Sequence, residues 1–277
     1  MTLKRRMRAL PLPGFLIALF LLAALAATGA VAADPQPLTF DAKSVGGPDS
    51  GSPLQIWRPA GKGPFPAMLV LHGCGGVYDN TRTWASRLAS WGYLGVIVDS
   101  FRPRHIKSVC NIGGTPTPRL RAQDAFNAAI YLRTLPDVLP DRIGAIGFSN
   151  GARTALFAAQ TSEVPTDRGG RPFAAIVAYY PGCESVQQRQ PMATDVLILI
   201  GKDDNWTLAA DCQKFVEASV GLPHAPAIKV YPGALHDFDR GGLPSFNNDH
   251  YTGGNPEAAA DSFVRTKAFL RERLLAK

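Results

Sequence analysis

The 277-residue sequence lacks a Cys-x-x-Cys spacing, a basic run interleaved with aromatic residues, an internal repeat and a low-complexity tract. The missing cysteine spacing argues against a zinc site. The missing basic run argues against nucleic acid as a partner. Without repeats or a second compositional block, the chain is predicted to form one large domain, which its length allows.

The N-terminus carries four basic residues within its first eight positions, followed by an uncharged stretch from Phe15 to Ala33 that ends in small residues. This order is typical of a secretory signal peptide. An uncleaved membrane anchor is the alternative, because the stretch is almost long enough to span a bilayer. We predict a signal peptide over residues 1–33 and an exported domain, periplasmic or secreted, over residues 34–277. Removal of the signal peptide takes away four basic and no acidic residues and lowers the net charge from +7 to +3.

Four cysteines lie in the predicted mature chain: Cys74, Cys110, Cys183 and Cys212. An even number in an exported protein permits disulfides. We favour Cys74 with Cys110 and Cys183 with Cys212, because each pair would join loops expected at the same edge of the sheet. Zinc binding and buried free thiols are the alternatives.

Short apolar runs alternate with helical stretches from Ala67 onward. This alternation implies a mostly parallel sheet with helices on both faces. Two earlier segments, separated by a glycine-rich joint, predict an antiparallel hairpin at the edge of the sheet. The predicted strands are 38–45, 54–58, 67–71, 93–98, 142–148, 174–180, 196–200 and 228–231. Four helices are predicted. The first contains Trp84 to Trp91, the second runs from Pro118 to Leu135, the third follows the segment 147–151 and ends at Gln160, and the last begins at Pro256.

The segment Gly147-Phe148-Ser149-Asn150-Gly151 joins a predicted strand to a predicted helix. In a nucleophile elbow the positions that flank the serine approach neighbouring backbone too closely to carry a Cβ, and Gly147 and Gly151 meet this requirement. The following helix directs N–H groups and its positive dipole end toward developing negative charge. An ordinary β-to-α turn is the alternative. The strand and helix around the motif favour Ser149 as a nucleophile.

Two further strand ends carry the groups that a serine nucleophile needs, a base and a carboxylate that orients the base. Among the five histidines, His236 follows the last predicted strand most closely and lies in the loop before the last predicted helix. We predict that His236 is the base and that Asp204 is the carboxylate, with Asp203 as the alternative and Asp237 as a more remote one. The carboxyl ends of parallel strands meet at one edge, so these groups are expected to converge.

Backbone N–H groups are expected to bind the oxyanion that forms during attack on a carbonyl. The N–H of Asn150, directly after the nucleophile, is one predicted donor. The glycine-rich loop that begins at His72 supplies the other, which we assign to Cys74, with Gly73 and Gly75 as close alternatives. A tight turn without a donor role is the other interpretation of this loop.

Five motifs together resemble the dienelactone hydrolase family of α/β-hydrolases. They are LHGCGG (71–76), VDSF (98–101), GFSNG (147–151), GKDDNW (201–206) and YPGALHDF (231–238). The chain order serine, acid, histidine is that of α/β-hydrolases. The resemblance implies an α/β-hydrolase fold without a large cap domain and a triad of Ser149, Asp204 and His236. The family's Gly-x-x-Asp acid loop favours Asp204, and its members act on ester or lactone carbonyls without a cofactor.

The sequence also departs from this family. Dienelactone hydrolases use a cysteine nucleophile, where this chain has Ser149, and carry a glutamate in the loop where it has His72-Gly73. An arginine that binds the substrate carboxylate in those enzymes has a match in Arg240, and Arg104 is a looser match to a second one. Both arginines can equally be solvated surface charges. Dienelactone itself is therefore not the expected substrate.

These observations predict an exported serine hydrolase that cleaves a small-molecule carboxylic ester or lactone through an acyl-enzyme, with no metal and no cofactor. The sequence does not indicate the size of the acyl group. A peptidase related to the prolyl oligopeptidase group is one alternative, although no gating domain fits in the chain. A catalytically silent α/β-hydrolase that acts as a binding protein is another. The sequence does not indicate an oligomeric state.

Overall fold

The computed structural model describes residues 36–39, 53–110, 116–186 and 190–276. The strands are β1 (Gln36–Thr39), β2 (Pro53–Trp57), β3 (Phe65–Leu71), β4 (Leu94–Val98), β5 (Val138–Phe148), β6 (Ile176–Tyr179), β7 (Val196–Gly201), β8 (Ala227–Tyr231), β9 (Ser245–Asn247) and β10 (His250–Thr252). The helices are α1 (Asp79–Ser90), α2 (Pro118–Leu132), α3 (Asn150–Ala159), α4 (Ala209–Ala218) and α5 (Pro256–Leu270), followed by a π-helical turn at Arg271–Leu275. Short 3-10 helices lie at Arg102–Arg104, Thr161–Glu163, Thr166–Arg168 and Cys183–Ser185.

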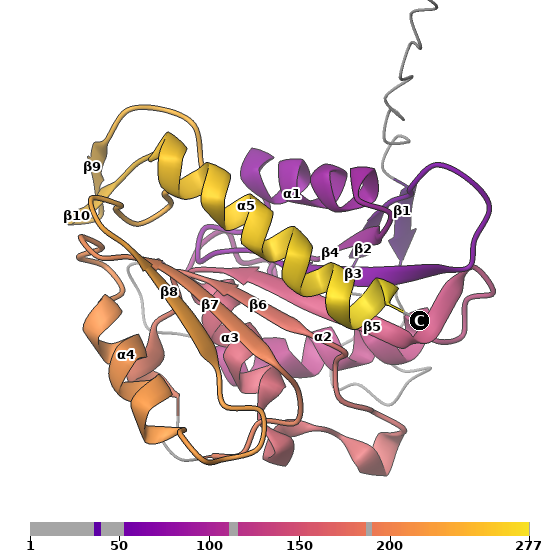
Figure 1. Ribbon diagram of the computed structural model, residues 1–277. Coiled ribbons are helices and arrows are strands. Elements are labelled where there is room, and N and C mark those ends of the chain that lie inside the picture. The colour runs from indigo at the N-terminus through magenta and orange to yellow at the C-terminus, as the bar shows by residue number, and fades with distance from the viewer. Residues whose placement is uncertain (1–35, 40–52, 111–115, 187–189, 277) are drawn as a thin grey trace, which may run out of the picture.

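The central sheet has eight strands in the order β1-β2-β4-β3-β5-β6-β7-β8 (Figure 1). All pairs from β4 to β8 are parallel, whereas β1 pairs antiparallel with β2 and β2 pairs antiparallel with β4. The predicted edge hairpin is therefore confirmed, although the part of its first strand beyond Thr39 lies outside the described residues. Strands β3, β4, β6 and β7 are buried along nearly their whole length, as their uninterrupted apolar sequences predict.

Helices cover both faces of the sheet, with α1 and α5 on one face and α2, α3 and α4 on the other (Figure 1). Trp84 of α1 is fully buried and contacts Phe263 of α5, with 5.3 Å between ring centroids. Helices α2 and α5 begin as predicted, because the side chains of Thr117 and Asn255 accept a backbone N–H at each N-terminus and proline follows each cap. The predicted mostly parallel α/β architecture is confirmed.

Strand β5 begins at Val138, four residues before the predicted start at Arg142. Pro140 and Asp141 are residue types that ordinarily favour turns. Val138 nevertheless pairs with Phe65 across a register shift in β3, so tertiary pairing outweighs local preference.

The loop between β8 and α5 contains a small hairpin, β9–β10, that the sequence analysis did not predict. The hairpin lies above the carboxyl edge of the sheet, and a bridge between His236 and Thr252 ties it to the loop after β8 (Figure 1). It is the one strand pair outside the central sheet among the described residues. Within the same ranges no helix is long and apolar enough to cross a membrane, and the predicted signal peptide over residues 1–33 lies outside them.

Candidate active site

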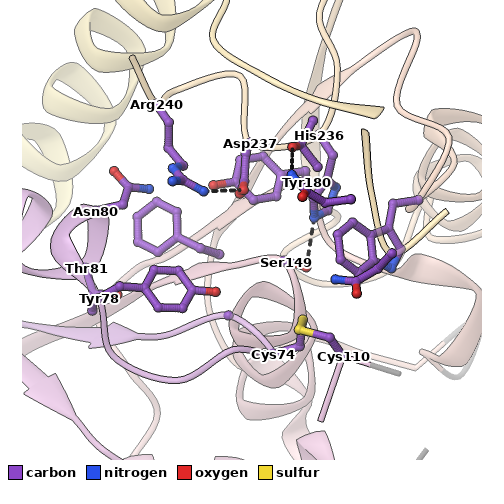
Figure 2. A pocket seen from close by; sticks show the side chains of 16 residues that line it. Cys74, Tyr78, Asn80, Thr81, Cys110, Ser149, Tyr180, His236, Asp237 and Arg240 are labelled. Atoms are coloured by element: carbon purple, nitrogen blue, oxygen red, sulfur yellow. Dashed lines mark hydrogen bonds and ion pairs between the residues drawn. A yellow bond between two sulfur atoms is a disulfide. The ribbon is translucent and has the colours of Figure 1, made fainter. Parts of the chain in front are cut away.

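Ser149 stands at the turn between β5 and α3 with φ of 52° and ψ of −116°, a backbone conformation that few residues other than glycine adopt. A Cβ on Gly147 would overlap the carbonyl of Gly151, and a Cβ on Gly151 would overlap the carbonyl of Leu71. Only glycine fits at both positions, which explains the sequence motif. The turn leaves Ser149 half-buried, with its Oγ facing a cleft (Figure 2).

His236 and Asp204 complete a line of hydrogen bonds that begins at Ser149. His236 Nε2 lies 2.9 Å from Ser149 Oγ (Figure 2), and His236 Nδ1 lies 2.8 Å from Asp204 Oδ2. Both residues are almost fully buried. The three side chains come from the ends of β5, β7 and β8, which explains how residues far apart in sequence meet at one edge of the sheet.

The two alternative carboxylates lie elsewhere. Asp203 is exposed, and its backbone N–H donates to the carbonyl of Ala234. Asp237 has φ of 61°, and its carboxylate accepts a hydrogen bond from Arg240 at 3.0 Å. Asp204, by contrast, binds the ring of His236 directly. The structure thus brings together the three residues that the sequence analysis preferred.

Asp204 is held by the two residues that follow it closely in the chain. Its Oδ1 accepts the backbone N–H groups of Trp206 and Thr207 at 2.9 Å each, and its Oδ2 lies 2.8 Å from the Thr207 hydroxyl. These bonds hold the carboxylate in an orientation that leaves Oδ2 facing the imidazole. The sequence analysis missed Thr207, although an aspartate whose side chain binds backbone two and three residues later is a known turn pattern.

The imidazole of His236 is enclosed by aromatic rings. Tyr180 and Trp206 lie 4.7 Å and 5.0 Å from it, measured between ring centroids. Burial by itself lowers the pKa of His236, but the hydrogen bond and charge of Asp204, with smaller contributions from Asp237 and Asp239, raise it above the usual 6.5. The ring is therefore a stronger base than a solvated histidine.

Asp239 binds Tyr180, one of the two rings that enclose His236. Its buried carboxylate accepts hydrogen bonds from Trp84 Nε1 and the Tyr180 hydroxyl, both at 2.7 Å, and from Asn80 at 3.2 Å. Burial raises the pKa of Asp239 despite these donors. No motif signalled this residue, because its partners come from three different parts of the chain.

His72 anchors the predicted oxyanion loop. The ring is fully buried, and its Nδ1 lies 2.8 Å from the carbonyl oxygen of Gly73. Its Nε2 accepts the backbone N–H of Ser100 at 3.3 Å. Burial, together with the charge of Arg121, lowers the pKa of His72 well below 6.5. The ring is therefore neutral, which suits a structural role in this loop.

Arg121 connects this loop to the nucleophile turn. Its buried guanidinium donates to the carbonyl of His72 at 2.6 Å and to the side chain of Asn150. The two segments that carry the predicted oxyanion donors, Cys74 and Asn150, are thus joined through one side chain. Sequence reasoning missed Arg121, since a single arginine on a helix carries no signal of its own.

Two clefts meet at Ser149. One is lined by Tyr78, Asn80, Asn247 and Arg240, and the other by Val109, Arg153, Glu184 and Thr207. Both clefts share Ser149, Trp206 and the disulfide between Cys74 and Cys110. The nucleophile therefore has room on two sides, as a reaction that splits a substrate into two parts requires.

The two arginines suggested by resemblance have different positions. Arg240 lines the first cleft and forms an ion pair with Asp237 (Figure 2). Arg104 lies outside both clefts, since its guanidinium binds both oxygens of Asp124, at 2.8 Å and 2.9 Å, and the carbonyl of Ser100. The geometry therefore contradicts a substrate contact by Arg104, whose charge is engaged inside the fold.

Both favoured disulfides are present, Cys74–Cys110 and Cys183–Cys212, so the free-thiol and zinc alternatives are wrong for these cysteines. Elsewhere in the described ranges, no group of three or more His, Cys, Asp or Glu side chains could hold a metal ion. Cys110 follows the loop whose Val109 N–H donates to the carbonyl of Cys74 at 2.8 Å. The first disulfide thereby fixes the predicted oxyanion loop to the wall of both clefts.

Replacing each disulfide by serine pairs is expected to separate stability from activity. The pairs span 36 and 29 residues, so each loss is expected to lower the free energy of unfolding by about 2–4 kcal/mol. The Cys74→Ser/Cys110→Ser variant should also lose about tenfold or more in kcat/KM, because the donor loop loosens. The Cys183→Ser/Cys212→Ser variant is the matched control. Equal kcat/KM in both folded variants would contradict the assigned role of the first disulfide.

Known proteins resemble this chain over most of its length. The sequence profile of the dienelactone hydrolase family matches residues 55–274. A Synechocystis protein named "Putative carboxymethylenebutenolidase" is 23% identical over 232 residues, which cover 78% of this chain and 90% of that protein.

Solved structures show the same fold. A dienelactone hydrolase-like promiscuous phosphotriesterase from metagenomic libraries superposes with a TM-score of 0.65 at 21% identity, over 87% of this chain and 98% of that one. Esterase 2 of Thermogutta terrifontis, solved after phosphorylation by paraoxon, superposes with a TM-score of 0.62 at 18% identity, over 88% and 96% of the two chains. The fold is that of the α/β-hydrolases, without an inserted cap domain among the described residues, and the chain belongs to the dienelactone hydrolase family.

Proposed function

We propose that this protein is an exported serine hydrolase that cleaves a carboxylic ester or lactone through an acyl-enzyme. The observation that carries the proposal is the unbroken line from Ser149 Oγ through His236 to Asp204, at 2.9 Å and 2.8 Å. A serine hydroxyl is a weak nucleophile unless a base takes its proton, and this line supplies the base.

The reaction uses groups of the chain and one water molecule. Ser149 Oγ attacks the substrate carbonyl carbon while His236 Nε2 takes the hydroxyl proton, and Asp204 stabilises the resulting imidazolium. The carbonyl oxygen becomes an oxyanion, which the N–H groups of Cys74 and Asn150 bind. Collapse expels the alcohol, which takes the proton from His236. Water then attacks the acyl-enzyme by the same steps and releases the acid and free Ser149.

Ester or lactone substrates are favoured by family membership and by the name of the Synechocystis relative, which describes a butenolide hydrolase. Arg240 in the first cleft adds a cation that can bind an anionic group of the substrate. A small substrate is favoured because disulfide, aromatic rings and the β9–β10 hairpin border the clefts closely. A peptidase would need longer clefts that hold several residues of a peptide.

A fluorophosphonate probe tests this proposal against a catalytically silent binding protein. Such probes react with an activated serine and leave a stable phosphonyl ester on it. We expect stoichiometric labelling of the folded protein, with the modification on the peptide that contains Ser149. A folded protein that resists labelling would favour the binding protein.

The acid limb of the pH profile follows from His236. The base must be neutral to accept the Ser149 proton, and its pKa is raised above 6.5. We therefore expect kcat/KM to fall as the pH decreases through a value above 6.5, and to level off on the alkaline side. Rates of ester hydrolysis measured between pH 5 and pH 9 check this, and an acid limb centred well below 6.5 would contradict it.

Export is the remaining part of the proposal. It is supported by the basic and then apolar N-terminus and by the two disulfides, which form in oxidising compartments. We propose that residues 1–33 are removed and that residues 34–277 form the mature hydrolase domain. Mass spectrometry of protein recovered after export should then give an N-terminus at Asp34.

A further inference from the structure

Tyr78 lies over the glycine-rich loop beside the nucleophile. It precedes α1 in an extended conformation, and its side chain lines the first cleft with 39% of the residue exposed. A Cβ placed on Gly75 would lie 2.5 Å from the Tyr78 hydroxyl oxygen and 2.8 Å from its Cε1. The ring therefore rests directly on this loop, and only glycine at position 75 permits the contact.

The Tyr78 hydroxyl is also close to Ser149. The point where a Cβ of Gly73 would lie is 3.6 Å from the hydroxyl oxygen and 3.9 Å from Ser149 Cβ. Figure 2 shows the ring projecting into the pocket, with its hydroxyl end directed toward the side that holds Ser149 and Cys74. The hydroxyl and the nucleophile thus flank the same backbone segment, which carries one predicted oxyanion donor.

The hydroxyl is protonated and able to donate. Burial and the charge of Asp237 raise the pKa of Tyr78, and these effects outweigh Arg240, Arg121 and a hydrogen bond from the Gly75 backbone, which lower it. Among the described residues no acceptor takes the hydroxyl proton, which leaves this proton available to a group bound in the cleft.

We propose that the Tyr78 hydroxyl is a third donor to the oxyanion, in addition to the backbone N–H groups of Cys74 and Asn150. This inference rests on the proposed hydrolase function. Negative charge grows on the carbonyl oxygen as Ser149 Oγ attacks, so a donor placed there binds the transition state more strongly than the substrate. The side chain then contributes to kcat rather than to substrate affinity.

The test compares Tyr78→Phe with Tyr251→Phe, a matched control on β10 whose ring is exposed and lies outside both clefts. Phenylalanine keeps the ring packing on Gly75 and removes only the hydroxyl. We expect Tyr78→Phe to lower kcat for a p-nitrophenyl ester about 10- to 100-fold with KM within about twofold, since loss of one oxyanion donor costs up to about 100- to 1,000-fold. Tyr251→Phe should equal the wild type.

A sulfur substitution separates donation from a structural role. The sulfur of a thionoester accepts hydrogen bonds poorly, so loss of a donor should slow the thionoester less than the oxygen ester. We expect the oxygen-to-sulfur ratio of kcat to shrink in Tyr78→Phe. Wild-type kcat in Tyr78→Phe, or an equal loss on both substrates together with a lower melting temperature, would overturn the inference. In either case, fluorophosphonate labelling of Ser149 in wild-type protein would leave the proposed function standing, whereas failure of wild-type labelling would remove both.

Discussion

Ser149→Ala is expected to abolish turnover of a p-nitrophenyl ester, with a loss in kcat of about 100,000-fold or more. Removal of the nucleophile from a serine triad costs nearly as much as removal of all three residues, because they act as a unit. Alanine fits the space of Ser149, which the elbow holds half-buried beside Gly147 and Gly151. Binding of substrate should change little, and steady-state kinetics with purified protein measure both quantities.

Ser90→Ala is the control for this experiment. Ser90 ends α1, is exposed, and its hydroxyl donates to the carbonyl of Arg87. It should leave kcat unchanged. If Ser149→Ala protein that is folded, by circular dichroism, turns over at more than a small fraction of the wild-type rate, another group is the nucleophile.

Asp204→Asn is expected to lower kcat by about 10,000-fold, an effect that exchange of the triad carboxylate for an amide has elsewhere. Oδ1 of Asp204 accepts two backbone N–H groups, so the amide oxygen of asparagine will take that place. The amide nitrogen must then face His236 Nδ1, where a donor stabilises the tautomer whose Nε2 carries the proton. Such a histidine cannot take the proton of Ser149.

Asp203→Asn is the matched control, because the two aspartates are neighbours and only Asp204 is buried against His236. It should retain kcat within about twofold. A large loss from Asp203→Asn together with an active Asp204→Asn would reverse the assignment of the acid. The melting temperature of each variant shows whether the fold persists.

The elements that sequence predicted best are those set by short-range geometry. The elbow required glycine at positions 147 and 151, and the structure places backbone carbonyls where side chains would otherwise stand. Buried strands such as β3 and β7 were visible as uninterrupted apolar runs. The topology of a parallel sheet then placed the loops of Asp204 and His236 at the same edge.

The features that sequence did not predict depend on distant partners. Arg104 followed a family pattern, but its charge is paired with Asp124 of α2, twenty positions away. The β9–β10 hairpin has only three residues in each strand, too few for a periodic signal. Asp239 binds Trp84, Tyr180 and Asn80, which lie on other elements, so it had no local motif.

The most direct test of the central claim is a pre-steady-state measurement with a p-nitrophenyl ester. The account predicts a burst of p-nitrophenol equal to the enzyme concentration, and an acyl group on the quenched protein that maps to the peptide containing Ser149. A burst requires that deacylation be slower than acylation, so the substrate to use is the ester of a small acid that is branched beside the carbonyl. An acyl group found on any other residue, or turnover with an unmodified Ser149 peptide at every time point, would contradict the account.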